Sequence, residues 1–186
     1  MLVNAASDSE VEFALMCERA EIARGLGARD ERMSDVIERF EHVHAGVDDL
    51  SGLLEHQALL ARGRNQLTAA VAFARRAVER ARADGACLEL SLGALAMTLV
   101  SAGLYQEAVE IGREHVAAAR AGGSKGSLVI ALSNLAEAEA GAGEGDLAVA
   151  ALDEAIEIIC ARRPTHPALG PLLERRRILL AQRPAG

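Results

Sequence analysis

Apolar residues recur along most of the chain at the three- and four-residue spacing of a helix face. Leu92, Leu95, Ala96 and Leu99 are typical, because positions i, i+3, i+4 and i+7 lie on one side of an α-helix. Glycine or polar residues interrupt this pattern every 12 to 20 residues or so, roughly the length of a helix in a globular protein. No stretch shows the strict alternation of a strand. The pattern predicts an all-α chain of about nine helices.

The helical segments also repeat. Residues 92–119 align with residues 132–159 at a spacing of 40, and residues 54–82 align with residues 92–120 at a spacing of 38. Four positions are identical in all three segments: Leu54, Leu92 and Leu132; Ala58, Ala96 and Ala136; Ala70, Ala108 and Ala148; Val71, Val109 and Val149. The alanines would let two antiparallel helices approach closely. A hairpin that cannot bury its apolar face alone must stack on a neighbour.

The best-kept unit runs Leu92-x-x-Leu95-Ala96-x-x-Leu99-x-x-x-Gly103-x-Tyr105-x-Glu107-Ala108, and it resembles a tetratricopeptide repeat (TPR). The next unit departs from the pattern, with Glu139 at a large apolar position and Gly145 in place of the tyrosine. The unit before has Asn65 in place of the turn glycine. Spacings of 38 and 40 exceed the usual period of about 34 residues. They resemble the helical arms of large bacterial signal-transduction ATPases and transcription regulators.

The resemblance implies a right-handed solenoid of stacked antiparallel helix hairpins. We expect a single domain over residues 1–186, made of a degenerate hairpin, three TPR-like repeats and a capping helix. These parts are predicted at residues 7–46; 51–84, 88–122 and 127–162; and 167–183. Ser127 is expected to cap the helix that follows the loop at Gly122 and Gly123.

In TPR arrays the first helix of each hairpin lines a concave groove. The resemblance places these residues in it: His56, Leu59, Gly93, Met97, Ser101, Ser133, Asn134 and Glu137. Asn134 matches a position at which ligand-binding members often bond a peptide backbone, since an amide both donates and accepts. The lysines that clamp a carboxylate in chaperone-binding members are absent, with Gly93 and Met97 in the groove instead. Gly93 and Ala94 have two readings, a small apolar groove floor or packing against neighbouring helices.

Composition and charge narrow the function classes. Hydrophobic residues make up 51% of the chain but aromatic residues only 2%, which argues against β folds and stacking platforms for nucleic acid. The net charge of −7 argues against direct nucleic-acid binding. Arginine dominates the basic residues, with Lys125 the only lysine, and this bias favours a bacterial source.

No catalytic, metal or cofactor motif emerges. His42 and His44 are two residues apart, so on a helix they diverge and do not form a ligand pair. Cys17, Cys87 and Cys160 are expected to be buried thiols of a reducing cytoplasm. No signal peptide or membrane-spanning stretch is recognised, so a cytoplasmic location without membrane contact is expected. The run of arginines at residues 175–177 is expected on the polar side of the capping helix.

Three functions remain. The first is a non-enzymatic module that binds a protein or peptide, as the sensory or scaffolding arm of a bacterial regulator. The second is a sensor that binds a small molecule or signalling peptide in the groove. The third is self-association, for example as a homodimer, through an apolar face of the first hairpin that carries Phe13, Leu15 and Met16. No cofactor is expected for any of them.

Overall fold

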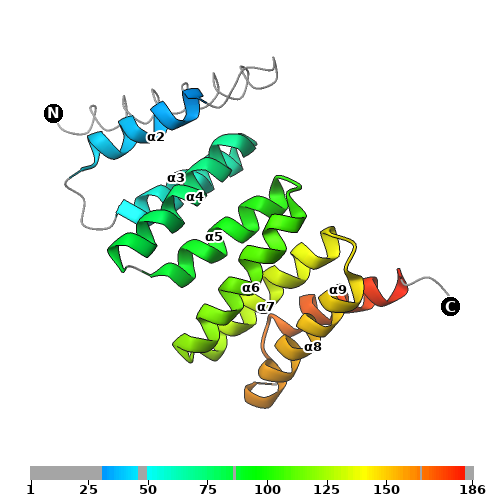
Figure 1. Ribbon diagram of the computed structural model, residues 1–186. Helices are drawn as coiled ribbons and strands as arrows, with labels where there is room; N and C mark the ends of the chain where they lie inside the picture. The colour runs from blue at the N-terminus through cyan, green and yellow to red at the C-terminus, as the bar shows by residue number, and fades with distance from the viewer. Residues whose placement is uncertain (1–30, 46–49, 86, 164, 183–186) are drawn as a thin grey trace. The chain divides into compact units, whose positions relative to one another are not determined.

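The structure is a computed structural model that describes residues 31–45, 50–85, 87–163 and 165–182, with side chains from residue 37 onwards (Figure 1). The expected self-association face at Phe13, Leu15 and Met16, Cys17 and the first part of the hairpin at 7–46 lie outside this range. The described residues contain helices and no strand. This confirms the predicted all-α class.

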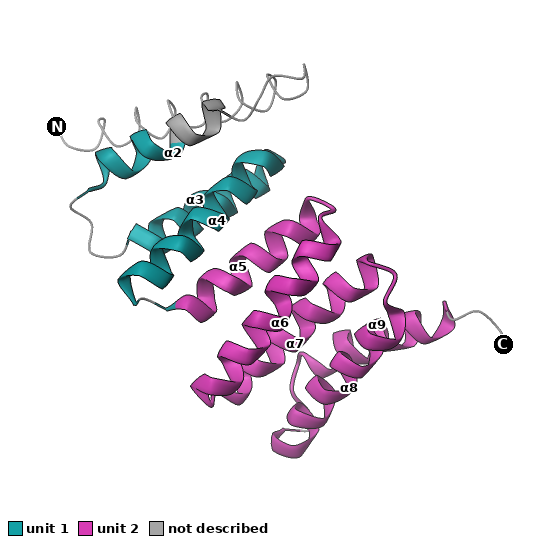
Figure 2. Ribbon diagram, viewed as in Figure 1, with its two compact units in different colours: residues 1–87 teal, residues 88–186 magenta. Residues whose placement is uncertain are grey.

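The chain divides into two compact units, residues 1–87 and residues 88–186 (Figure 2). The first contains the helices α2 (Glu31–Val43), α3 (Leu50–Gly63) and α4 (Leu67–Asp84). The second contains α5 (Leu88–Ser101), α6 (Tyr105–Gly122), α7 (Lys125–Gly141), α8 (Gly145–Arg162) and α9 (Leu169–Ala181). The organisation as a single domain stays a prediction.

Neighbouring helices pack as hairpins in both units. In the first unit α3 packs on α4, and in the second α5 packs on α6 and α7 on α8. Within the second unit α7 also packs on both helices of the preceding hairpin, and α9 packs on α8. This is the stacked arrangement of antiparallel hairpins that the repeats predict.

The repeated alanines are buried in these hairpins. All six are at most 1% exposed: Ala58, Ala70, Ala96, Ala108, Ala136 and Ala148. The order of buried and half-buried residues over 91–100 recurs unchanged over 131–140, so the second unit keeps the 40-residue register in its packing. The apolar pattern of the sequence therefore fixes which face of each helix is buried.

The turns inside the hairpins also correspond. Gly103 and Gly143 have left-handed φ values of 72° and 82°, and Asn65 has a φ of 59°. Asparagine is one of the few side chains that adopt this conformation readily, so it replaces the turn glycine without breaking the hairpin. The helix after Gly123, however, begins at Lys125, and its cap is Ser124, whose Oγ accepts a hydrogen bond from the Ser127 N–H at 3.3 Å. The expected cap at Ser127 was wrong by three residues.

Tyr105 lies at the first position of α6, beside the turn, and packs against α7. A Cβ atom added to Gly141 would lie 2.2 Å from Cδ1 of the Tyr105 ring, so the ring occupies the space that a side chain at 141 would fill. The tyrosine of one repeat thus covers the glycine at the end of the next first helix. Gly145 replaces the tyrosine in the following repeat.

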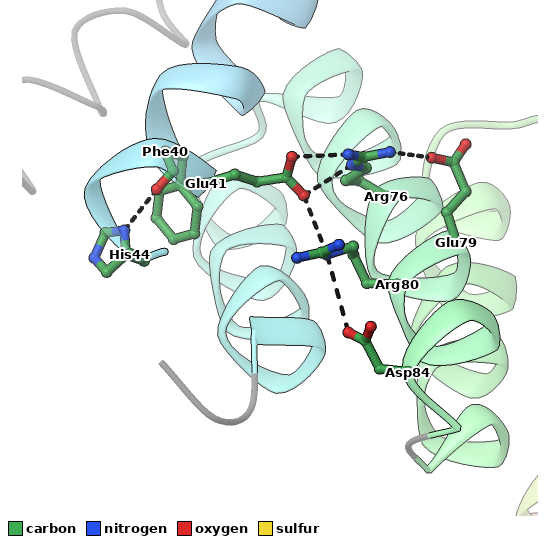
Figure 3. Close-up of polar contacts among 7 residues, drawn as sticks. All are labelled: Phe40, Glu41, His44, Arg76, Glu79, Arg80 and Asp84. Carbon is green, nitrogen blue, oxygen red and sulfur yellow. Dashed lines mark hydrogen bonds and ion pairs between the residues drawn. The ribbon is translucent and has the colours of Figure 1, made fainter. Parts of the chain in front are cut away.

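An ion-pair cluster joins α2 to α4 in the first unit (Figure 3). The Arg76 guanidinium donates two hydrogen bonds of 2.8 Å to the two carboxylate oxygens of Glu41, and Arg80 lies 3.6 Å from the same carboxylate. Phe40 and Phe73 meet edge to face beside it, with ring centroids 5.5 Å apart. The hydrogen bond from Arg76 lowers the pKa of the Glu41 carboxyl.

Candidate functional site

The first helices of the last two repeats, α5 and α7, pack against each other and present matching half-buried rows. The two rows, which we call the α5/α7 face, consist of Gly93, Ala94 and Met97 on α5 and of Ser133, Asn134 and Glu137 on α7. Since α5 and α7 share the repeat register, the rows lie at equivalent positions of neighbouring helices. Ser101 is exposed at the end of α5. Six of the eight predicted groove residues therefore belong to this unit.

The hydroxyl groups of this region are turned toward their own helices. Ser101 Oγ donates to the Met97 carbonyl at 2.9 Å, and Ser133 Oγ donates to the Val129 carbonyl at 2.7 Å. Such bonds to the carbonyl four residues earlier satisfy a hydroxyl donor locally. The two serines can therefore offer a partner only acceptor capacity.

Asn134 has unused hydrogen-bonding capacity. Its side chain is half-buried on α7 and makes no hydrogen bond to any residue that the structure describes. The amide carries two N–H donors and a carbonyl acceptor, which match the alternating groups of an extended peptide backbone. Of the α5/α7 face, Asn134 is thus the side chain best equipped to bond a ligand.

Glu137 is already paired. Arg175 of α9 donates a hydrogen bond of 2.8 Å from Nη2 to the Glu137 carboxylate, across 38 residues of sequence. The two following arginines also bind acids: Arg176 pairs with Asp153 on α8, and Arg177 pairs with Glu174 on its own helix at 2.7 Å. The capping helix therefore reaches the α5/α7 face at Glu137, and a ligand would meet an ion pair there rather than a free carboxylate.

Gly93 is explained by a packing requirement. A Cβ atom at this position would lie 2.9 Å from Cε1 of His115, which extends from α6 and is only 3% exposed. The positions equivalent to His115 in the other repeats hold alanine, at Ala77 and Ala155. Burial lowers the pKa of His115, while the negative charge of Glu89 opposes this shift. The absence of a side chain at 93 makes room for a buried, neutral imidazole. A role of Gly93 in binding stays a prediction.

Glu139, like His115, is a buried polar residue at a position where the other repeats do not need one. It is 4% exposed at the position equivalent to Leu99, and burial raises the pKa of its carboxyl. Arg113 lies 3.7 Å from Oε1, while Oε2 has no hydrogen-bond partner among the residues that the structure describes. The sequence alignment marks Glu139 as an exception, but the depth of its burial follows only from the structure.

His56 and Leu59 lie on α3 in the first unit, so they are described apart from the α5/α7 face. Both are exposed, Leu59 by 53%. His56 makes no hydrogen bond or ion pair with the described residues. Their part in binding stays a prediction.

The cysteines differ from expectation. Cys87 and Cys160 are free and exposed rather than buried, whereas Cys17 is outside the described residues. Ile159 takes the buried position on α8, which turns the next residue outward. Among described residues, no group of three or more His, Cys, Asp or Glu side chains could hold a metal ion. No helix in the described part of the chain is long and apolar enough to cross a membrane.

Comparison with solved structures bears out the repeat fold. The chain is similar to a Podosopora anserina protein described as a kinesin light chain with nearly identical TPR-like repeats. The TM-score is 0.59 and the identity 20%, over 93% of this chain and 98% of that one. No protein-family model and no curated protein matches the sequence. The chain therefore has the fold of TPR-like helical repeats.

Proposed function

We propose that this chain is a non-enzymatic helical-repeat module that binds an extended segment of a partner protein along the α5/α7 face. The observation that carries the proposal is the half-buried Asn134 amide, which makes no hydrogen bond to any described residue. A solvated amide at the middle of two parallel helical rows can both donate to and accept from a peptide backbone without displacing an internal bond.

The neighbours of Asn134 support an apolar or mixed peptide. Met97 on α5 is half-buried, and its flexible thioether adapts to different apolar side chains. The pair of Glu137 and Arg175 presents both charges at one edge, so it favours polar residues without selecting one sign. A peptide with small apolar residues next to an exposed backbone fits this surface best.

The test is selection of peptides from a random display library on the full chain, with affinities then measured by fluorescence polarisation. Asn134→Ala is expected to weaken the selected peptides about tenfold, the effect of one to two lost hydrogen bonds. Gln106→Ala is the matched control, because Gln106 is an exposed amide on α6. Peptides that bind the Asn134 variant with unchanged affinity would place the site elsewhere. Failure to retain any peptide or protein would refute the binding role.

We further propose that the module acts as the sensory or scaffolding arm of a bacterial cytoplasmic regulator. The support is the stretched repeat spacing of 38 and 40 residues together with the TPR-like fold. The complete reading frame of the gene tests this proposal, since a regulator arm must be joined to, or encoded beside, an effector domain.

A further inference from the structure

A hollow of about 610 Å³ lies at the open end of the α7–α8 hairpin, and none of its lining residues belongs to the α5/α7 face. Figure 1 shows that α7 begins and α8 ends at the same end of this hairpin. The connection to α9 forms the third wall through His166 and Ala168. We call this space the α7–α8 hollow. Its volume is within the ~300–1,000 Å³ of sites for small ligands.

Four apolar, β-branched side chains line the hollow, and we refer to them together as its floor. The floor consists of Val129 and Ile130 on α7 and of Ile158 and Ile159 on α8. Ile159 is buried, but Ile130 is 60% exposed. A large apolar side chain left in water beside other apolar side chains gains free energy when a ligand covers it. The floor therefore favours an apolar body.

Three basic residues also line the hollow. They are Lys125, Arg162 and Arg163, and none of these side chains makes an ion pair with a described residue. Among the described residues, no acidic one lines the hollow. His166 adds an N–H donor, since its Nδ1 accepts a bond from the Ala168 N–H at 3.2 Å and leaves the proton on Nε2. In a chain of net charge −7, three unpaired cations gathered at one opening favour an anion.

Five of the positions that line the hollow hold different kinds of residue in the preceding hairpin. Forty residues earlier, the equivalents of Ile158, Ile159, Arg162 and Arg163 are Ala118, Ala119, Gly122 and Gly123. The equivalent of Val129 is the acid Glu89. The connection is also longer here, since residues 163–168 join α8 to α9 and only residues 123–124 join α6 to α7. Apolar bulk, basic charge and a wider loop thus occur together at this one hairpin end.

We propose that the α7–α8 hollow binds a small amphiphile with a compact anionic head, a carboxylate or a phosphate monoester, on an unbranched apolar tail. The tail lies on the isoleucines of the floor, and the head accepts hydrogen bonds from Arg162, Arg163 and Lys125. Guanidinium groups suit both heads, because their paired N–H donors match two oxygens of one anion. The hollow shares no residue with the proposed peptide site and is tested with different ligands, so either proposal can fail without the other.

Isothermal titration of the full chain with decanoate, decyl phosphate and decanol, each below its micelle concentration, tests the proposal. We expect one site per chain for at least one of the anions, with weaker affinity as salt is raised. The stronger anion identifies the head group. Equal binding of decanol, or no binding of either anion, would overturn the proposal.

Variants locate the binding. The double variant Arg162→Gln with Arg163→Gln is expected to weaken the anion about tenfold or more, the effect of lost charge-assisted bonds. The control, Arg120→Gln with Arg177→Gln, removes the same charge from exposed arginines outside the hollow and should leave the affinity within about twofold. Ile130→Ser alters an exposed side chain, so it should weaken the tail contact while the circular dichroism spectrum is kept. Equal losses in the control and the test variant would refute the assignment.

Discussion

Replacement of Glu139 by leucine is expected to stabilise the protein, because the carboxylate occupies the buried position that Leu99 fills in the preceding repeat. Glu139 is 4% exposed and Leu99 is fully buried. The carboxylate also lies in the last turn of α7, where the helix dipole disfavours a negative charge. The native pair with Arg113, at 3.7 Å, compensates little, since the Arg113 side chain is 54% exposed.

The size of the gain follows from these terms. Burial of a leucine side chain contributes about 1.5–3 kcal/mol, and replacement of a buried charge by an apolar group of similar volume stabilises proteins by up to about 4 kcal/mol. Loss of the exposed Arg113 pair costs up to about 1 kcal/mol. The free energy of unfolding should therefore rise by about 1–3 kcal/mol, and the melting temperature by roughly 3–10 °C for a chain of this size.

The pH dependence separates charge from packing. The pKa of Glu139 is raised by burial from 4.5, so the folded protein holds this proton more tightly than the unfolded chain does. The stability that this proton contributes is complete below pH 4.5 and is lost as the pH rises through the folded-state pKa. Glu139→Gln lacks this loss. Its advantage over the wild type should be small below pH 4.5 and fully developed above the folded-state pKa.

Urea unfolding followed by circular dichroism at several pH values measures both effects in the full chain. Other titrating groups are common to the wild type and the variants, so their contributions cancel in the difference. An advantage of Glu139→Gln that does not change with pH would refute the argument from burial. A Glu139→Leu variant that is less stable than the wild type at neutral pH would refute the expectation that leucine is preferred at this buried position.

Two further substitutions test contacts on which each unit depends. Gly93→Ala should destabilise the protein by about 1–3 kcal/mol, because the methyl group of the new alanine would lie 2.9 Å from Cε1 of His115. A second substitution in the same chain, His115→Ala, should restore most of this loss. Additive effects of the two substitutions in thermal unfolding would contradict this contact. Glu41→Gln should cost about 1 kcal/mol by removing the pair with Arg76. Because that pair lowers the pKa of Glu41, its stabilisation is present above pH 4.5 and is lost as the pH falls through the folded-state pKa. The exposed Glu38→Gln is the control, and an equal loss in urea unfolding for both variants would count against the pair.

The fold was predictable because its main determinants are local. The spacing of apolar residues sets the buried face of each helix, and the repeated alanines, such as Ala96 and Ala108, mark where helices meet. At Asn65 the sequence showed only a departure from the turn glycine, and the structure shows that asparagine adopts the left-handed turn conformation there. Cap positions and cysteine exposure were less predictable. Ser124 and Ser127 are both good caps, and a shift of one residue on a helix moves a side chain by 100°.

The candidate site was predictable in position but not in chemistry. The half-buried rows of α5 and α7 follow from the repeat register, which places Gly93 with Ser133 and Met97 with Glu137. The state of each side chain depends on partners distant in sequence. Glu137 is paired with Arg175, 38 residues later. The space that a side chain at position 93 would occupy is filled by His115 from another helix. No local pattern carries that information.

The second unit offers an internal comparison, because its two hairpins share one register but differ at 20 of the 28 aligned positions of 92–119 and 132–159. Where they agree, as at Leu92 and Leu132, packing alone explains the residue. Where one hairpin has a polar or charged residue and the other does not, the second hairpin folds without that residue, so the fold does not require it. Glu139 in place of leucine and Arg162 in place of glycine are such differences, and a buried carboxylate opposes stability. Some residues are absent from one copy of the repeat but present in the other, where they reduce stability. Such residues are the best candidates for selection by a binding function.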